Sequence, residues 1–476
     1  MEFNLGKRYC YYFNEIAKIP HGSRNEKALS DYIVQFAKDH NLPYKQDEVY
    51  NVIIEKEASE GYEDAAPLIL QAHIDMVPEK NRDSDHDFLK DPLDLYVEDG
   101  LLKARGTTLG ADDGTGVVYM LAILEDDSLA HPKLECIFTT MEEIGLLGAS
   151  ALKPEDVHAD RMISLDGGPE GCTLLSSAGG ATVYARRKLN YEPNDKPAYR
   201  VAVKGLSGGH SGGEIHKEKG NANKLVARLV KEAQLAGADV QLVSYNGGLK
   251  DNAIPREADI VFVSSTPKEE LQASLEKTAK EIATELEFSD AGFKMELEEV
   301  SCDSCLTKED SQAILDFAFL MPDGFKHRSM VIEGLTVTSL NLGVVTTDEN
   351  QIEFSSLLRS ALDSGTENLI REIEVLASIM GFDVEVTAKY PGWNYSETSA
   401  MRDIYGKVMK DFGRELVVEA AHGGCECGVF KGLNPNIDII SFGPITRYIH
   451  TPDEELDLAS FDRSYEILCA IIKECR

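Results

Sequence analysis

The sequence predicts an α/β fold with a mostly parallel sheet sandwiched by helices. Apolar stretches of strand length alternate with amphipathic stretches of helix length. This alternation is the pattern of a parallel sheet covered on both faces. Several of the expected strands also end in acidic residues or histidine, where a core strand would ordinarily stay apolar. Because ligands bind at the carboxyl ends of strands in such sheets, we expect a functional site at that edge.

The composition limits the class of protein. The chain has 476 residues, enough for two or three domains, and 43% of them are hydrophobic. Its net charge of -34 argues against nucleic acid and anionic membrane as partners. No apolar run reaches the roughly 18–20 residues of a membrane span, and the N-terminus lacks a secretion signal. Nine scattered cysteines fit a reduced compartment, so we expect a cytoplasmic protein.

The first third of the chain provides the strands of the expected sheet. Ser23 is expected to cap the second helix, because Glu26 follows it at the spacing of a capping box. A glycine-rich loop then opens a third helix at about Asp113. In chain order we expect helices at 8–18 and 24–39, strands at 49–56 and 67–75, a loop with a hairpin turn at 79–100, and strands at 134–143 and 161–168.

The pattern of expected strands and helices changes near residue 183, which predicts an inserted domain. We expect a discontinuous catalytic domain at 1–182 and 389–476, interrupted by an α+β domain at 183–388. The segment 390–397 reads as a linker and carries the only tryptophan. Inside the insertion we expect helices near 219–236, 267–287 and 364–380, with strands at 335–355 and 382–388.

Polar residues at the strand ends predict a metal site. His73 and Asp75 are two apart on a buried strand, so their side chains share one face. An imidazole and a carboxylate are costly there unless a charged group sits between them. Glu143 and Asp166 end two further strands, and histidine and carboxylate are the ligands that zinc takes in catalytic sites.

Two adjacent aspartates, Asp112 and Asp113, lie at the glycine-flanked start of a helix. One of them is placed to bridge two cations, which need a shared carboxylate when they lie about 3.5–4 Å apart. The last ligand is either His422 or His450, and spacing alone leaves both open. Of the pair Glu142 and Glu143, one carboxylate can bind metal, while the free one can move a proton from water to a leaving amine.

Each of these features, taken alone, also has an ordinary explanation that involves no function. A pair of glutamates is usually solvated, and a histidine such as His210 in a glycine-rich loop is usually incidental. Arg359 reads as a surface arginine on a helix when taken alone. The pair Cys302 and Cys305 has no second such pair, so a solvated loop is expected there. The functional reading depends on all the features occurring together at strand ends.

Eight sequence motifs together resemble one family. The chain is similar to the bacterial aminoacyl-histidine dipeptidases, also called Xaa-His dipeptidases or carnosinases, of the di-zinc superfamily that includes aminoacylases and glutamate carboxypeptidases. The resemblance spans about residues 8 to 470. It rests on AHIDMV, GTTLGADDGTGV, TTMEEIGLLGA, SLDGG, KGLSGGHSGGEIH, DNAIPREA, AHGGCECG and GPITRYIHTPDE.

The resemblance implies a role for each candidate residue. One zinc would bind His73 and Asp166, the other Glu143 and His450, and Asp112 would bridge them. Asp75 would orient His73, Glu142 would be the general base, and the insertion would be a lid domain. The substrate would be bound by His210, Asn252, Arg359 and Gly424. Two departures are the Gly424–Cys425 pair before ECG, which would alter the substrate pocket, and Thr451 in place of serine.

The implied activity is hydrolysis of Xaa-His dipeptides, including β-Ala-His, with two Zn²⁺ per chain. Mn²⁺ or Co²⁺ could substitute, because carboxylate-rich sites also accept them. A tripeptidase or an aminoacylase on the same scaffold is an alternative, and so is a metal-binding scaffold without activity. The expected partner is a small peptide. A homodimer stays open, and with it whether His210 serves its own site or that of a second subunit.

Overall fold

Residues 3–476 are described by a computed structural model in which the chain forms two units. Unit 1 comprises Met1–Ser177, Trp393–Ala420 and Cys425–Arg476. Unit 2 comprises Ala178–Gly392 and Ala421–Gly424. Unit 1 is therefore interrupted twice in the sequence, by a long segment and by a short segment of unit 2. The expected lid at 183–388 falls within unit 2, and its role as a lid stays a prediction.

Unit 1 contains a six-stranded sheet in the order β1-β2-β6-β3-β7-β23. The four strands from β6 to β23 are parallel, whereas β1 and β2 join antiparallel, so the sheet is mixed. The strands of this sheet are β1 (Tyr44–Gln46), β2 (Val52–Lys56), β3 (Leu68–His73), β6 (Leu134–Thr139), β7 (Arg161–Pro169) and β23 (Asp438–Gly443).

The helix α3 (Ala111–Glu125) is the central helix of unit 1. Every residue from Asp113 to Leu124 is buried, which is the pattern of a helix surrounded by protein. Tyr119 stacks on Phe461 of the last helix and donates a 2.6 Å hydrogen bond to its carbonyl oxygen. The other helices of unit 1 are α1 (Arg8–Ile16), α2 (Lys27–Asp39), α4 (Leu147–Ala151), α9 (Ala400–Asp411), α10 (Glu426–Leu433) and α11 (Leu458–Glu474).

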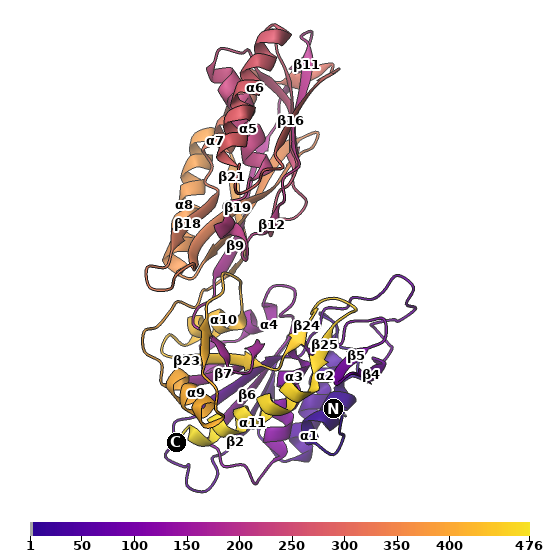
Figure 1. Ribbon diagram of the computed structural model, residues 1–476, viewed down its shortest axis with the longest axis vertical. Helices are drawn as coiled ribbons and strands as arrows, with labels where there is room; N and C mark the ends of the chain where they lie inside the picture. The colour runs from indigo at the N-terminus through magenta and orange to yellow at the C-terminus, as the bar shows by residue number, and fades with distance from the viewer. Residues whose placement is uncertain (1–2) are drawn as a thin grey trace. The chain divides into compact units, whose positions relative to one another are not determined.

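Short strands complete unit 1. The expected hairpin turn at 99–100 joins β4 (Leu95–Glu98) to β5 (Leu101–Ala104), as the sequence predicts. This hairpin extends into a four-stranded sheet with β25 (Glu455–Asp457) and β24 (Thr446–Arg447). A parallel pair is formed by β8 (Cys172–Leu174) and β22 (Val417–Glu419), and a 3-10 turn spans Pro154–Asp156. Figure 1 shows β24 and β25 in yellow beside the indigo hairpin.

Unit 2 is built on a nine-stranded sheet whose pairs are all antiparallel. Its order is β16-β11-β15-β13-β19-β20-β9-β21, and β18 pairs with β19. These strands are β9 (Gly179–Lys188), β11 (Ala198–Lys204), β13 (Gln241–Gly247), β15 (Ala258–Val263), β16 (Lys294–Val300), β18 (Gly324–Arg328), β19 (Thr336–Thr347), β20 (Gln351–Ser360) and β21 (Asp383–Tyr390).

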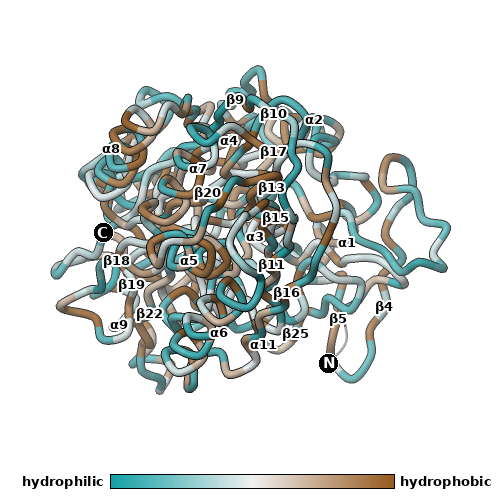
Figure 2. The backbone as a smooth tube through the Cα atoms, turned by 90° about the horizontal axis from the view of Figure 1, so that it is seen from above, coloured by the Kyte–Doolittle hydropathy of each residue, from teal (hydrophilic) through white to brown (hydrophobic). Residues whose placement is uncertain are grey.

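Four amphipathic helices pack on this sheet: α5 (Ala222–Leu235), α6 (Lys268–Glu285), α7 (Lys308–Leu320) and α8 (Asp363–Met380). In Figure 2, α5 and α8 alternate between brown and teal, as helices with one buried face do. Two two-stranded sheets pair β10 (Tyr191–Pro193) with β17 (Ser304–Leu306) and β12 (Gly209–His210) with β14 (Ala253–Ile254). A 3-10 turn spans Ile215–Lys217.

Three sequence-based readings are wrong. Ser23 does not cap α2, which begins at Lys27; its hydroxyl instead donates a 2.8 Å hydrogen bond to Asp75 Oδ2. Arg359 lies on strand β20 and is buried, so it is not a surface residue of a helix. Cys305 is buried on β17 rather than solvated in a loop. Separately, no helix among residues 3–476 is long and apolar enough to cross a membrane.

Candidate metal centre

The carboxyl ends of β3, β6 and β7 lie at one edge of the sheet of unit 1, because these strands are parallel neighbours. His73 is the last residue of β3 and is only 1% exposed. Glu142 and Glu143 follow the end of β6, and Asp166 lies in the last half of β7. The sheet therefore gathers the side chains that the sequence places at strand ends.

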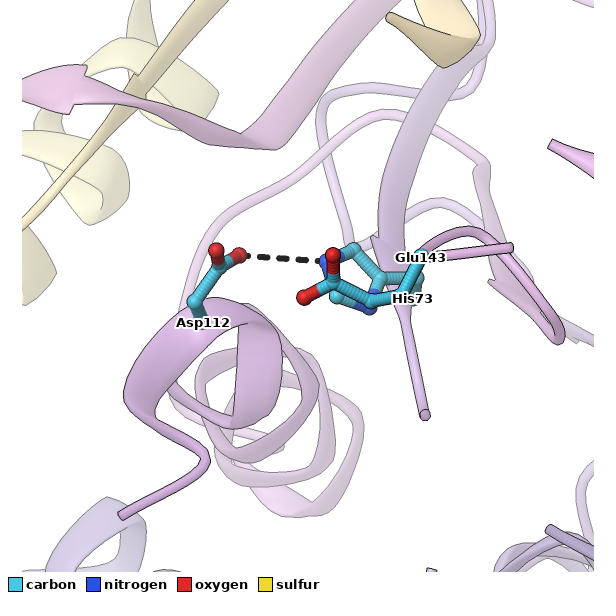
Figure 3. A group of neighbouring side chains, drawn as sticks. All are labelled: His73, Asp112 and Glu143. Atoms are coloured by element: carbon cyan, nitrogen blue, oxygen red, sulfur yellow. Dashed lines mark hydrogen bonds and ion pairs between the residues drawn. The ribbon is translucent and has the colours of Figure 1, made fainter. Parts of the chain in front are cut away.

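Asp112 is the centre of the cluster. Its Oδ1 lies 3.2 Å from His73 Nε2, and its Oδ2 lies 3.2 Å from His450 Nε2. One carboxylate thus presents each of its oxygens to a different imidazole. Asp112 and Asp113 have non-helical backbone angles at the start of α3, which turns the carboxylate of Asp112 away from the helix. Figure 3 shows Asp112 facing His73 and Glu143.

Glu143 is the third residue of a group whose side chains could bind one metal ion. One donor atom from each of His73, Asp112 and Glu143 lies within 4.8 Å of the other two. Glu143 Oε1 is also 3.0 Å from Nε2 of His450. Of the two histidines that the sequence left open, it is therefore His450 that lies with this group. His422 belongs to unit 2, where its Nε2 is 2.7 Å from Ser339 Oγ.

The electrostatics of the cluster favour positive charge. Hydrogen bonds to Asp112 and Glu143 raise the pKa of His450 to about 10. Burial lowers the pKa of His73, but the carboxylates of Asp112 and Asp75 outweigh it and raise that pKa well above its usual value. Burial raises the pKa of Asp112, yet its bonds to the two histidines lower it overall. Such a field is what a divalent cation requires.

Asp75 organises the loop that carries the two glutamates. Its Oδ1 accepts a 2.9 Å hydrogen bond from the backbone N–H of Glu142, and its Oδ2 accepts one of 3.3 Å from that of Glu143. His73 Nδ1 lies 3.0 Å from the backbone oxygen of Asp75 and 3.6 Å from its Oδ1. The backbone oxygen is thus the nearer acceptor for His73, while the carboxylate fixes the glutamate loop. The orienting role of the Asp75 carboxylate stays a prediction.

Glu142 and Asp166 are partly buried acids beside the cluster. Burial raises the pKa of Glu142 well above its usual value, and the charges of Asp166 and Glu143 add to the effect. Burial and the charge of Asp112 raise the pKa of Asp166 to about 6. Asp166, Asp112 and Asp113 line a cavity of about 80 Å³. Asp166 is not one of the three residues whose donor atoms meet, so its part in a metal site stays a prediction.

Beneath this edge of the sheet lies a buried hydrogen-bond network that sequence reasoning missed. Glu426 Oε2 accepts hydrogen bonds from Gln71 Nε2 at 2.6 Å and from Thr139 Oγ1 at 2.7 Å. Gln71 Oε1 accepts a third, of 2.8 Å, from Ser164 Oγ. The network joins α10 to β3, β6 and β7. Its one sequence signal is a polar residue in each of three buried strands.

The substrate residues expected in the inserted domain lie together in unit 2. Arg359 on β20 pairs directly with Ser339 on β19 and Gly180 on β9. Arg359 is 7% exposed, and its Nε has no hydrogen-bond partner among residues 3–476. The hydroxyl of Ser339 lies beside the imidazole of His422. A buried guanidinium with an unused donor is a suitable binding group for a carboxylate.

His210 and Asn252 are neighbours through the small sheet of β12 and β14. His210 pairs with Ala253, and the backbone N–H of Ser211 donates a 2.9 Å hydrogen bond to the Asn252 carbonyl. The side chain of Asn341, two residues from Ser339 on the same face of β19, donates hydrogen bonds of 2.7 and 2.9 Å to the carbonyls on either side of Asn252. Burial and the charge of Arg359 lower the pKa of His210.

Gly424 packs closely against the ring of Tyr390. A Cβ added to it would lie 2.7 Å from the hydroxyl of Tyr390. A Cβ added to Gly212 would lie 2.6 Å from the carbonyl oxygen of His422 and 3.0 Å from the ring of His210. His210, Arg359 and the segment 422–424 thus share one region of unit 2, which the sequence divides over more than 200 residues.

The residues of unit 1 fit a pair of divalent cations. Two imidazole nitrogens and the oxygens of two carboxylates converge, and a third carboxylate, Asp166, lies beside them. This donor set is the one that zinc prefers when histidine and carboxylate are mixed. Asp112 presents two oxygens in two directions, as a bridging carboxylate must. The number and kind of ions belong to the proposal below.

Comparisons with known proteins identify the family. Residues 69–474 match the peptidase family M20/M25/M40. The chain is 37% identical to the cytosol non-specific dipeptidase of Escherichia coli over 470 residues, which are 97% of this chain and 96% of that protein. The crystal structure of aminoacylhistidine dipeptidase from Vibrio alginolyticus superposes with a TM-score of 0.91 at 34% identity, covering 98% and 96% of the two chains.

A more distant likeness concerns the fold alone. The aminopeptidase PepT from Bacillus cereus superposes with a TM-score of 0.57 at 16% identity over the whole of both chains. The dipeptidase resemblance that the sequence motifs indicate is thus confirmed by relatives that cover nearly all of the chain. The α/β fold with mixed sheets accords with the same superposition.

Proposed function

Because the chain belongs to the peptidase family M20/M25/M40 and is a dipeptidase-type metallopeptidase, we propose that it hydrolyses Xaa-His dipeptides, including β-Ala-His, with two Zn²⁺ ions. The observation that carries the proposal is Asp112, whose two oxygens face His73 and His450. The name of the Vibrio alginolyticus relative supports the preference for histidine. The name of the Escherichia coli relative supports a cytoplasmic location and a broader dipeptide range as the second candidate.

The five proposed ligands divide over two cations. One would bind His73 and Asp166, the other Glu143 and His450, with Asp112 shared. When bound, the pair would polarise the scissile carbonyl and lower the pKa of the attacking water. Mn²⁺ or Co²⁺ are alternative occupants, since carboxylate-rich sites accept them too. Asp75 supports the arrangement through the backbone of Glu142 and Glu143.

Glu142 is the proposed general base. The five proposed ligands do not include Glu142, whose backbone N–H is held by the carboxylate of Asp75, and this leaves its side chain to carry a proton. Burial raises the pKa of Glu142 well above its usual value, which strengthens this carboxylate as a proton acceptor. Glu142 would take a proton from the attacking water and deliver it to the departing amine.

Unit 2 is proposed to recognise the substrate. Arg359 and Asn252 would bind the terminal carboxylate, because the guanidinium is buried with an unused donor. His210 would stabilise the negative charge on the carbonyl oxygen in the transition state. Gly424 would line the pocket through its backbone. The recognition of a free carboxylate fits a peptidase that acts on short peptides.

A panel of substrates tests the proposal. Hydrolysis of β-Ala-His, Gly-His, Leu-Gly, Leu-Gly-Gly and N-acetyl-Leu is measured before chelation, after chelation and after zinc is restored. We expect zinc-restored cleavage of the two histidine dipeptides above the others. Equal cleavage of Leu-Gly would favour the broader dipeptidase. Cleavage of only the tripeptide or the acetylated amino acid would contradict both, and no cleavage by protein with bound metal would favour a scaffold.

A further inference from the structure

The loop that carries His450 needs support from outside itself. The side chain of His450 is 46% exposed, whereas those of His73, Asp112 and Glu143 are 1%, 18% and 7% exposed. The backbone of His450 has a φ of 63°, in the left-handed region that residues other than glycine seldom adopt. Thr451 Oγ1 closes a local turn by donating a 2.6 Å hydrogen bond to the Tyr448 carbonyl.

Glu454, at the end of the same loop, reaches a different part of the chain. Its side chain is buried, with the residue 3% exposed. Oε2 accepts hydrogen bonds from the backbone N–H groups of Leu109 at 2.7 Å and Gly110 at 3.0 Å. Oε1 accepts them from Ala111 at 2.9 Å and Asp112 at 3.4 Å. One carboxylate therefore binds four successive backbone amides.

The segment 109–112 is shaped to bind an anion. Gly110 has a φ of 68°, and a Cβ there would lie 2.9 Å from the sulfur of Met76. The left-handed glycine turns successive N–H groups toward one point, as in the backbone nests that bind anions. Here the anion comes from the protein itself. The last residue of the nest is Asp112, the carboxylate that faces both histidines.

We infer that Glu454 is a positioning residue that holds the His450 loop against the Asp112 loop and so sets the affinity of the metal centre. The inference rests on the proposed metal site. His450 and Asp112 are 338 residues apart in the sequence, so chain connectivity does little to hold them together. A tether of four hydrogen bonds fixes their separation before a cation binds. Partners of this kind typically alter metal affinity about 10–100-fold when removed.

Charge alone could also explain an effect of Glu454, since a nearby carboxylate attracts cations. Two substitutions separate the explanations. Glu454→Gln removes the charge and replaces one acceptor oxygen with an NH₂ group, which cannot accept from the nest. Glu454→Asp keeps the charge but shortens the reach by one methylene. A positioning role requires both variants to weaken metal binding, whereas a purely electrostatic role leaves Glu454→Asp like the wild type.

Glu135 provides a matched control. It is also a buried glutamate of unit 1, 2% exposed, and it accepts hydrogen bonds from the backbone N–H groups of His158 and Ala159 at 3.2 and 3.4 Å. It lies near the beginning of β6, at the opposite end of that strand from Glu143. Glu135→Gln therefore repeats the chemical change of Glu454→Gln away from the proposed ligands.

The experiment measures zinc affinity of the full chain after chelation, by calorimetry or by competition with a chelator of known affinity. Circular dichroism verifies the fold of each metal-free variant. We expect Glu454→Gln to weaken zinc binding by about 10–100-fold, Glu454→Asp to fall between it and the wild type, and Glu135→Gln to stay within about twofold of the wild type. If Glu454→Gln fails to fold, the zinc affinity of Glu454→Asp alone tests the inference.

Two results would overturn the inference. Equal zinc affinities for Glu454→Gln and Glu135→Gln would show that the tether is structural only. Wild-type affinity in Glu454→Asp would assign any effect to charge. A wild-type chain that binds no divalent cation would instead contradict the proposed function, and the measurement separates the cases because it needs no substrate.

Discussion

The two units concentrate opposite charges. In unit 1, Asp112, Glu143 and the nearby acids surround two histidines and raise the pKa of His450 to about 10. In unit 2, the buried guanidinium of Arg359 lies with two histidines whose pKa values are lowered by burial and by that guanidinium. One unit therefore favours a cation and the other an anion. The two environments share histidine and differ in the charged partner, which is a carboxylate in unit 1 and a guanidinium in unit 2.

The difference lies in what holds each cluster. In unit 1, buried carboxylates accept hydrogen bonds from backbone N–H groups, as Asp75 does for the loop of Glu142 and Glu143. In unit 2 the anchoring side chain is a hydrogen-bond donor: the amide of Asn341 donates to the backbone carbonyls on either side of Asn252. The anchor is therefore a side chain in both units, an acceptor in unit 1 and a donor in unit 2.

The largest effect is expected for Glu142→Gln. Loss of the general base should lower kcat by about 10²–10⁴-fold, while zinc stays bound. Steady-state kinetics and metal analysis of the same sample check this. The matched change at the neighbouring residue, Glu143→Gln, should instead weaken zinc binding. A Glu142→Gln enzyme with wild-type kcat would remove Glu142 from the mechanism.

Metal removal should affect one unit only. A ligand that binds the folded state alone stabilises it by about 4 kcal/mol when present at a thousand times its Kd. Chelation should therefore lower the unfolding temperature of unit 1 and leave that of unit 2 unchanged, and it should abolish hydrolysis. Hydrogen exchange read separately in β3 and in β20 distinguishes the units. Equal loss of protection in both would contradict a metal centre confined to unit 1.

Arg359→Met should act on substrate recognition and leave metal binding alone. A hydrogen bond to a charged group contributes about 1.5–3 kcal/mol, so kcat/KM for a dipeptide with a free carboxylate should fall about 10–100-fold. For the amidated dipeptide little should change. Arg200→Met is the matched control, because Arg200 lies on the same sheet but is paired with Asp259 at 3.0 Å. Equal losses on both substrates would exclude carboxylate recognition by Arg359.

The sequence predicted the local features of unit 1 well. Strand ends follow from apolar runs that stop at polar residues, so His73 was placed at the end of β3 by pattern alone, whereas β7 continues past Asp166 to Pro169. Ser23 shows where pattern fails: its spacing to Glu26 matches a capping box, but the hydroxyl bonds Asp75 from another part of the chain. Local chemistry permits both arrangements, and only the fold selects one.

Hydrogen-bond partners that are far apart in the sequence could not be predicted, for the same reason. Neither the four amides at Glu454 nor the partners of Glu426 follow from residues near them in the sequence. Arg359 illustrates the opposite error, because a segment rich in leucine and serine reads equally as helix or strand. Its pairing with β19 and β9 decides the matter. Spacing likewise left His422 and His450 open until the fold separated them by unit.

The smallest effect concerns the pH dependence of unit 2. Burial and the charge of Arg359 lower the pKa of His422 to about 3, against about 6.5 in the unfolded chain. Between these values the unfolded state binds more protons, so stability is complete above pH 6.5 and is lost as the pH falls toward 3. At pH 5 the loss from this residue should be about 2 kcal/mol.

Urea unfolding of the wild type and of His422→Gln at pH 7.5 and pH 5 measures that contribution. The difference between the two pH values should be smaller in His422→Gln by about 2 kcal/mol. Ser339→Ala is the companion variant: it removes the 2.7 Å contact to Nε2 but leaves the histidine buried, so the pH dependence should persist. If His422→Gln retained the full wild-type dependence, the loss of stability would have to come from other groups, and the charge of Arg359 would not govern this region of unit 2.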